Sequence, residues 1–199
     1  MNMLEQHGIV KTGHFRLASG RHSAKYVNKD AIWPKGPCVY RQVVYGLAEL
    51  AGVGKPIVSR RYDLVTGPAI AGAVLAATVA WLVDKPFVYP EKIVSTYHDQ
   101  MEFRRGFPAA IKDKRVLIIE DVITTGASVI KVANAIWACD GAVTGVVCMW
   151  NRSSTWPAGM PSVEVRSLVH EAIESWEAKE CPLCAEGVPL TDPKGGDDK

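Results

Sequence analysis

Two adjacent carboxylic acids, Glu120 and Asp121, follow four aliphatic residues within the stretch VLIIEDVITTGAS at positions 116–128. Carboxylates accept hydrogen bonds from the hydroxyl groups of a sugar. The small residues at 124–128 offer hydroxyl and backbone N–H groups, which hold a phosphate well when a helix follows them. This combination predicts a site for a ribose 5-phosphate.

The elements that must position these groups are a strand, a tight loop and a helix. Residues 116–119 are aliphatic without alternation, which is typical of a short strand covered on both faces. Residues 128–139 place apolar side chains at helical spacing. The two acids therefore lie at the carboxyl end of the predicted strand. The loop lies at the amino end of the helix, where backbone N–H groups and the helix dipole attract an anion.

Three other interpretations of the acids explain less of the stretch. Nucleotide triphosphatases also end a strand in magnesium-binding acids, but their loop G-x-x-x-x-G-K-[ST] is absent, and GVGKP at 52–56 does not fit it. The glycine loop TGPAIAG at 66–72 has the wrong spacing for a dinucleotide fingerprint. Capping of the next helix would not require two adjacent acids.

A resemblance to a known family rests on several segments of the chain. VLIIEDVITTGAS resembles, in all thirteen positions, the motif with which type I phosphoribosyltransferases bind phosphoribosyl diphosphate (PRPP). Further segments, taken in order, are similar to those of orotate phosphoribosyltransferases, and especially of the branch found in archaea and some thermophilic bacteria. They are GHFRLASGRHSAKYVNKD (13–30), TGPAIAG (66–72), MEFRRGF (101–107), WNR (150–152) and CPLCAEGVPL (181–190).

The resemblance implies an α/β chain with the type I phosphoribosyltransferase fold. In that fold a central parallel sheet is flanked by helices, and a small lid made of the N-terminal and C-terminal segments covers the carboxyl edge of the sheet. The alternation of strand and helix patterns along the chain favours the same sheet. The predicted strands are 63–66, 87–89, 116–119, 143–149 and 163–167, and the predicted helices are 40–51, 70–83 and 128–139.

We predict one phosphoribosyltransferase domain over residues 1–190. Within it, residues 1–35 contribute to the lid, residues 89–107 form a mobile catalytic loop, and residues 177–190 form a C-terminal segment with a C-x-x-C motif. The polar, glycine-containing residues 191–199 are expected to be a disordered tail.

The resemblance also assigns roles to single residues. Orotate is a planar carboxylate, which a guanidinium group matches at two points, and Arg152 stands where the family keeps its orotate-binding arginine. An ordinary surface arginine is the alternative at that position. Thr124 and Tyr26 are the other expected orotate contacts. The expected catalytic residues are Lys92, Glu120 and Asp121, and the expected PRPP contacts are Lys92, Glu120, Asp121, Val122, Ile123, Thr124, Thr125, Gly126, Ala127 and Ser128.

The side of the site that binds the leaving pyrophosphate departs from the better-known bacterial enzymes. Those enzymes carry lysines where this chain has Ile70, Ala71 and Ala18, and a more basic mobile loop. The basic residues of the loop at 89–107 are Lys92, His98, Arg104 and Arg105. We choose Lys92 for the pyrophosphate contact. At least one of the two arginines is expected to brace the loop or to contact another subunit.

The resemblance implies Mg²⁺ as cofactor, held mainly by PRPP and not by protein ligands, PRPP and orotate as substrates, and a homodimer. Lys plus Arg number 23 and Asp plus Glu number 21, a net charge of +2 that indicates no nucleic-acid partner. No apolar run approaches the roughly 20 residues of a membrane span, so we expect no membrane association. The N-terminal residues lack the pattern of a secretion signal, and we expect a cytoplasmic protein.

The chain has five cysteines, an odd number that argues against a disulfide framework. Cys181 and Cys184 form a C-x-x-C pair, which supplies two of the four ligands of a structural zinc ion. Metal binding would need a histidine or a second subunit. The interpretation we favour from the sequence is a tight turn that only packs on the rest of the chain.

The expected activity is transfer of the 5-phosphoribosyl group from PRPP to orotate, which gives orotidine 5-monophosphate and pyrophosphate in de novo pyrimidine (UMP) biosynthesis. Two alternatives stay open. One is a phosphoribosyltransferase that salvages another base, and the other is a non-catalytic relative that senses PRPP and regulates transcription or another enzyme. A regulator of nucleic acid would be expected to carry a more basic surface.

Overall fold

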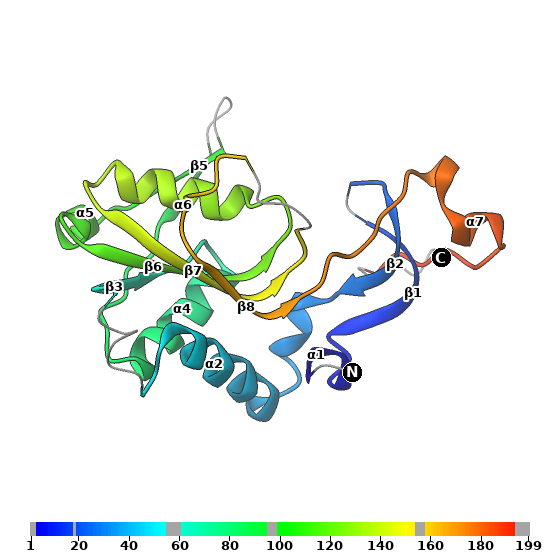
Figure 1. The fold of residues 1–199 in the computed structure, drawn as a ribbon, viewed down its shortest axis with the longest axis horizontal. Coiled ribbons are helices and arrows are strands. Elements are labelled where there is room, and N and C mark those ends of the chain that lie inside the picture. The colour runs from blue at the N-terminus through cyan, green and yellow to red at the C-terminus, as the bar shows by residue number, and fades with distance from the viewer. Residues whose placement is uncertain (1–2, 18, 55–60, 95–98, 154–157, 194–199) are drawn as a thin grey trace. The chain divides into compact units, whose positions relative to one another are not determined.

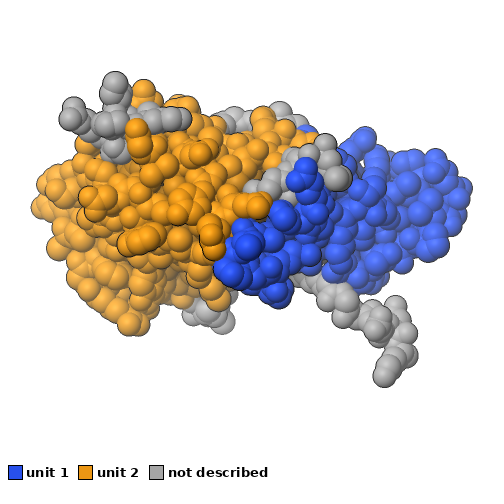
Figure 2. Space-filling model, turned by 90° about the horizontal axis from the view of Figure 1, so that it is seen from below, with its two compact units in different colours: residues 1–39, 172–199 blue, residues 40–171 orange. Residues whose placement is uncertain are grey.

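A computed structural model of the chain describes residues 3–17, 19–54, 61–94, 99–153 and 158–193 (Figure 1). The chain divides into two compact units, one of residues Met1–Val39 with Ala172–Lys199 and one of residues Tyr40–Glu171 (Figure 2). The N-terminal and C-terminal segments thus fold together in one unit. Their placement as a lid over the sheet stays a prediction.

A four-stranded parallel sheet forms the centre of the larger unit. Its strands follow the order β3 (Leu64–Thr66), β6 (Arg115–Ile123), β7 (Ala142–Asn151) and β8 (Val165–His170). Each neighbouring pair is parallel, so the predicted parallel sheet is confirmed. Parallel strands end at a shared edge, and this edge is where ligands bind in open α/β sheets.

Helices cover both faces of this sheet (Figure 1). Helix α4 (Ala71–Leu82) packs on β3 and β6, and α6 (Ala127–Trp137) packs on β6 and β7 from the opposite face. Another long helix in the described part of the chain is α2 (Pro37–Ala51). Residues 116–119 are buried without alternation because both faces of β6 are covered. None of the described helices has the length and apolar character that crossing a membrane requires.

Strand β6 is longer than predicted. The sequence indicated an end at residue 119, but the strand continues through the two acids to Ile123. Its partner β7 continues equally far, so that Glu120 pairs with Cys148 and Ile123 with Asn151. The acids therefore belong to the last part of a hydrogen-bonded strand, and their backbone positions are fixed by β7.

The predicted strand at 87–89 is wrong as a strand, since it makes only a single bridge from Phe87 to Val65. Pro86 and Pro90 flank the segment, and proline has no N–H group to extend a ladder. The Val88 carbonyl still accepts a bond of 2.8 Å from the buried Thr66 hydroxyl. The segment thus lies along the sheet edge without joining it fully.

The predicted loop at 89–107 has a folded stem. Strands β4 (Glu91–Val94) and β5 (Asp99–Glu102) pair as an antiparallel hairpin, with Lys92 opposite Met101. Strand β5 contacts α6, and the buried Phe103 that follows it joins the core between α6 and the sheet. The short helix α5 (Phe107–Ile111) comes next. Residues 95–98 lie outside the described residues.

The smaller unit is built on a hairpin of β1 (Val10–Arg16) and β2 (His22–Val27). Its other elements are α1 (Met3–Gln6), η1 (Lys29–Ile32), η2 (Ala178–Glu180) and α7 (Pro182–Ala185). Thr191 pairs with Phe15, and its N–H donates to the His14 carbonyl at 2.8 Å. The predicted start of the tail at residue 191 is therefore too early. Residues 194–199 lie outside the described residues.

We expect Ile118→Ala to destabilise the protein by about 2–5 kcal/mol, because Ile118 is fully buried in the core between the sheet and α6 and the change leaves a cavity. Urea denaturation measures the loss. Val74→Ala on α4 is the matched control: Val74 is 42% exposed, and its change should cost less than about 0.5 kcal/mol. Similar losses for both would contradict this assignment of the core.

Candidate active site

A hollow of about 220 Å³ opens between the end of β6 and the start of α6. Eight of the ten predicted PRPP contacts line it, and Asp121 and Lys92 are not among the lining residues. Val129 is an additional lining residue, which was not singled out in the sequence because it reads as part of the apolar face of the helix. The lining residues are Glu120, Val122, Ile123, Thr124, Thr125, Gly126, Ala127, Ser128 and Val129.

The start of α6 forms the part of this hollow that is suited to an anion. Gly126 has a φ of +74°, a left-handed conformation that glycine adopts at little cost, and it turns the chain from the loop into the helix. The first bond that closes a turn here runs from the Ile130 N–H to the Gly126 carbonyl at 2.9 Å. The preceding N–H groups point out of the helix end, together with its positive dipole. Thr124, Thr125 and Ser128 are exposed, so a ligand can reach their hydroxyl groups.

Glu120 and Asp121 are both 4% exposed. The Asp121 N–H donates to Glu120 Oε1 at 2.8 Å, and the Val122 N–H donates to Asp121 Oδ1 at 2.5 Å. Removing a carboxylate from water is costly, and such bonds offset part of that cost. These bonds hold both carboxylates in place, and Glu120 is the one of the two that lines the hollow.

Cys148 lies opposite Glu120 on β7 and is fully buried. Burial raises the pKa of its thiol well above the usual range, and the charges of Glu120 and Asp121 raise it further. The thiol therefore stays protonated at neutral pH. A nucleophilic cysteine needs a lowered pKa, so Cys148 is a packing residue beside the site.

The glycine loop after β3 packs closely against the end of β6. A Cβ atom at Gly67 would lie 2.4 Å from the Gly72 carbonyl oxygen and 2.5 Å from the Ile119 carbonyl oxygen, and one at Gly72 would lie 3.1 Å from Glu120 Oε1. The peptide bond between Ala69 and Ile70 in this loop is cis. The glycine loop is evident in the sequence, but its contact with the end of β6 was not predicted, because the two segments lie about 50 residues apart in the chain.

Arg152 begins the loop that follows β7. Its backbone N–H donates to the Ile123 carbonyl at 2.8 Å, next to the pairing of Ile123 with Asn151. Asn151 Oδ1 in turn accepts the Ser153 N–H at 3.0 Å, which stabilises the turn. The structure thus brings Arg152 to the same sheet edge as the hollow. Its contact with orotate stays a prediction.

Lys92 lies on the hairpin strand β4 and is exposed. The two arginines that follow the hairpin make ion pairs with its own acids. Arg105 Nε lies 2.8 Å from Glu91 Oε1 and Arg104 Nη2 lies 3.1 Å from Glu102 Oε2, contacts that suit the bracing role expected for at least one of them. His98 lies outside the described residues.

Tyr26 belongs to β2 in the smaller unit. Its ring packs at a tilt against Phe15, with the two ring centroids 5.9 Å apart, and it pairs across the hairpin with Lys11. The structure therefore gives Tyr26 a packing role within its own unit. Its contact with orotate stays a prediction.

Comparison with known proteins identifies the family. A model of the phosphoribosyl transferase domain matches residues 55–180. The chain is 38% identical to an orotate phosphoribosyltransferase of Thermoanaerobacter sp. (strain X514), over 94% of this chain and 90% of that protein. This chain belongs to the orotate phosphoribosyltransferase family. A second family member, from Caldanaerobacter subterraneus subsp. tengcongensis, is 35% identical over 97% of this chain and 94% of its own.

Solved structures agree with the family fold. The orotate phosphoribosyltransferase of Aeropyrum pernix superposes with a TM-score of 0.62 and 25% identity, over 84% of this chain and 92% of that one. An adenine phosphoribosyltransferase of Trypanosoma brucei gives a TM-score of 0.60 at 21% identity, over 93% of this chain and 90% of that one, and shows the shared fold alone. The predicted type I phosphoribosyltransferase fold is confirmed.

We expect Gly67→Ala to destabilise this orotate phosphoribosyltransferase family member by about 1–3 kcal/mol, because the added methyl group meets two backbone carbonyl oxygens. Gly145→Ala on β7 is the control. Its methyl group would lie 3.2 Å from the flexible end of Leu117 and at an ordinary contact distance of 3.7 Å from the Glu164 carbonyl oxygen, so the change should cost less than about 1 kcal/mol. Urea denaturation compares the two. An equal loss for both variants would show that the loop is free to move away from β6.

Proposed function

We propose that this chain catalyses transfer of the 5-phosphoribosyl group from PRPP to orotate, with release of pyrophosphate and formation of orotidine 5-monophosphate in de novo pyrimidine biosynthesis. The observation that carries the proposal is the hollow itself. It places a buried carboxylate, small hydroxyl side chains and the start of a helix around one space. Membership of the orotate phosphoribosyltransferase family supports orotate as the base that accepts this group.

In this proposal the residues from Thr124 to Ser128 bind the 5-phosphate, and Glu120 and Asp121 accept hydrogen bonds from the ribose hydroxyl groups. The sugar becomes positively charged as pyrophosphate leaves C1. Carboxylates near the ring stabilise that positive charge better than neutral groups would, because they are negatively charged. They are also already oriented before the reaction. The same two acids therefore contribute to both substrate binding and catalysis.

Mg²⁺ fits the donor groups at this site. Magnesium prefers hard oxygen ligands and is commonly bound through substrate phosphates with one or two carboxylates. The acids available here are Glu120, which lines the hollow, and the adjacent Asp121. These few protein carboxylates suit a Mg²⁺ ion that is held mainly by PRPP and enters the site with it. When bound, the ion would neutralise charge on the departing pyrophosphate.

The remaining contacts to pyrophosphate and orotate are proposals from the family resemblance. Lys92 is the cation we assign to pyrophosphate, and its exposure on the hairpin suits a contact made with an arriving substrate. Arg152 is assigned to the orotate carboxylate, with Thr124 and Tyr26 at the base. Location of Arg152 beside the end of β6 supports its assignment.

We also propose that the enzyme works as a homodimer in the cytoplasm. Trp81 on α4 is 78% exposed, and Tyr45 on α2 is 49% exposed. Large apolar side chains of this kind are common at subunit interfaces. Light scattering of the purified chain measures that assembly directly.

The test is turnover of purified protein with PRPP and Mg²⁺, followed by the loss of the near-ultraviolet absorbance of orotate, with uracil, hypoxanthine and adenine assayed in parallel. Turnover with orotate alone supports the proposal. Turnover with another base instead would make the chain a salvage enzyme. PRPP binding without turnover of any base would make it a PRPP-sensing relative.

We expect Glu120→Gln and Asp121→Asn each to weaken PRPP binding at least about tenfold, because each change removes charge from a hydrogen-bond acceptor. Isothermal titration calorimetry with PRPP and Mg²⁺ measures this loss. Glu164→Gln is the control, since Glu164 is an exposed acid that pairs with Arg61 near the opposite end of β8. Unchanged binding in both site variants would remove the acids from the ribose site.

For Arg152→Ala we expect the KM for orotate to rise by about 10–100-fold, because a two-point bond between guanidinium and carboxylate is lost. The KM for PRPP should change less than about threefold, since Arg152 is not assigned to that substrate. Steady-state kinetics with each substrate varied in turn gives both values, and Arg61→Ala serves as the control. An equal rise in both constants would give Arg152 a structural role.

A further inference from the structure

Four side chains with metal-binding atoms converge in the smaller unit. They are His14 on β1, His22 on β2, Cys181 just before α7 and Cys184 within it. Their ligand atoms all lie within 4.8 Å of one another. All but Cys184 belong to buried residues. We propose that these four side chains bind one structural Zn²⁺ ion.

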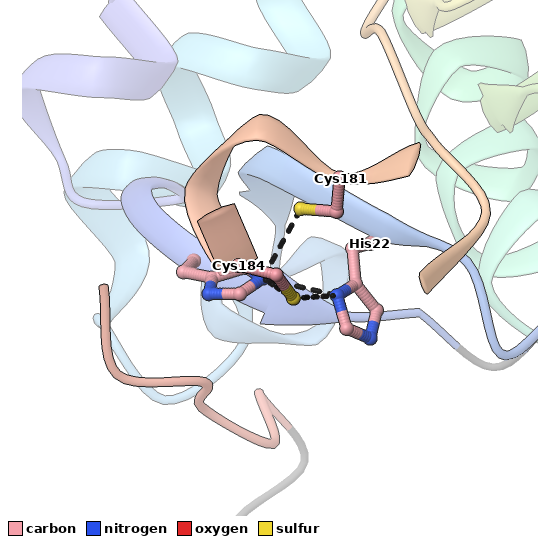
Figure 3. Close-up of side chains that lie close together, drawn as sticks. His22, Cys181 and Cys184 are labelled. Atoms are coloured by element: carbon pink, nitrogen blue, oxygen red, sulfur yellow. Dashed lines mark hydrogen bonds between the residues drawn. The ribbon is translucent and has the colours of Figure 1, made fainter. Parts of the chain in front are cut away.

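The distances between the ligand atoms suit a tetrahedral ion. His14 Nε2 lies 3.4 Å from Cys181 Sγ, 3.7 Å from Cys184 Sγ and 3.0 Å from His22 Nδ1. Cys184 Sγ lies 3.2 Å from His22 Nδ1, and Figure 3 shows the side chains of Cys181, Cys184 and His22 close together. Zinc bonds of about 2.3 Å to sulfur and 2.0–2.1 Å to nitrogen separate the ligands of a tetrahedral site by roughly 3.3–3.8 Å. These four separations each lie within a few tenths of an ångström of that range, and the two remaining separations, from Cys181 Sγ to the ligand atoms of Cys184 and His22, are at most 4.8 Å.

The environment of His14 orients its ring for metal binding. His14 Nδ1 lies 2.8 Å from the Val188 carbonyl oxygen. A carbonyl oxygen only accepts, so Nδ1 carries the proton and Nε2 directs its lone pair at the cluster. A zinc-binding histidine usually donates its second N–H group to a carbonyl or a carboxylate in this way, which fixes the ring.

Backbone bonds also hold the ligands from both ends of the chain. His22 exchanges two backbone hydrogen bonds with Trp176, of 2.8 and 2.9 Å, and the His14 carbonyl accepts the Thr191 N–H. The C-terminal segment is thus paired with the hairpin on either side of the two cysteines. The histidine ligands and the cysteine ligands are brought together by pairing that does not itself need the metal.

The ligand set favours a closed structural site with zinc. Two thiolates and two neutral imidazoles form the Cys₂His₂ set of structural zinc sites, which leaves no open position for a substrate. The two thiolate charges balance the charge of the ion, which limits the cost of burying it. Soft sulfur ligands with imidazole in a tetrahedral arrangement select zinc over magnesium. The preference for a simple turn at the C-x-x-C pair is therefore revised.

A metal ion suits the size of this unit. The unit consists of a two-stranded hairpin, short helices and a C-terminal segment, with few buried apolar side chains such as Leu4, Ile9 and Phe15. Small units with limited cores are commonly stabilised by metals or disulfides. Zinc would join the β1–β2 hairpin to the C-terminal segment, and its binding energy would add to the stability of the unit.

Metal analysis tests this proposal, and it does not depend on turnover. The full chain, without a histidine tag, is equilibrated with Zn²⁺ under reducing conditions, freed of unbound metal and measured by plasma mass spectrometry. We expect about one zinc ion per chain, and less than about one-fifth of that in Cys184→Ser and His22→Asn. Cys38→Ser, which changes an exposed cysteine outside the cluster, should keep the zinc.

Two further measurements keep the test decisive if a variant fails to fold. Replacement of zinc by Co²⁺ in the unmutated chain should give the visible absorption of tetrahedral cobalt with thiolate ligands. Removal of the metal with a chelator should lower its Tm by at least about 5 °C, and zinc should restore it. An unmutated chain that takes up no zinc, a cobalt complex without thiolate absorption, or a Cys181–Cys184 disulfide in the native chain would overturn the proposal.

Discussion

Parallel pairing of β6 with β7 over the whole length of both strands is the interaction on which the larger unit depends. Because of this pairing, β6 continues beyond the aliphatic residues 116–119 to Ile123, and Glu120 and Asp121 lie within a hydrogen-bonded strand. The strand then ends beside Arg152, whose N–H closes on Ile123. Because β7 holds the backbone, the acids, the loop and the arginine occupy one edge of the sheet without a further structural device.

The second constraint is the burial of two charged side chains, Glu120 and Asp121, away from solvent. Two neighbouring carboxylates are buried at that edge, and the backbone N–H groups of Asp121 and Val122 donate hydrogen bonds to them. The thiol of Cys148 beside them stays neutral, because burial and the nearby charges of Glu120 and Asp121 raise its pKa. Glycines at 67 and 72 let a second loop approach the acids closely. The buried acids therefore lie next to the loop that is proposed to bind the phosphate, an arrangement that suits a sugar phosphate.

The smaller unit follows a different physical logic. Its apolar core is small, so pairing between the first strands and the C-terminal segment supplies much of its order. The same pairing brings two histidines and two cysteines together. In the larger unit, burial of aliphatic residues between the helices and the sheet supplies the order, and the polar residues of the site lie at the edge of the sheet.

The sequence by itself determined the local part of the site and the family. An aliphatic run, two acids, small residues and a helical pattern follow one another within VLIIEDVITTGAS, so short-range sterics and hydrogen bonding define the strand, loop and helix. Tertiary structure alone decided where β6 ends, why residues 87–89 are no full strand, and how the stem at 91–102 folds. It also decided that His14 and His22 meet Cys181 and Cys184. These features depend on pairing between segments distant in sequence, whose register and partners no local pattern encodes.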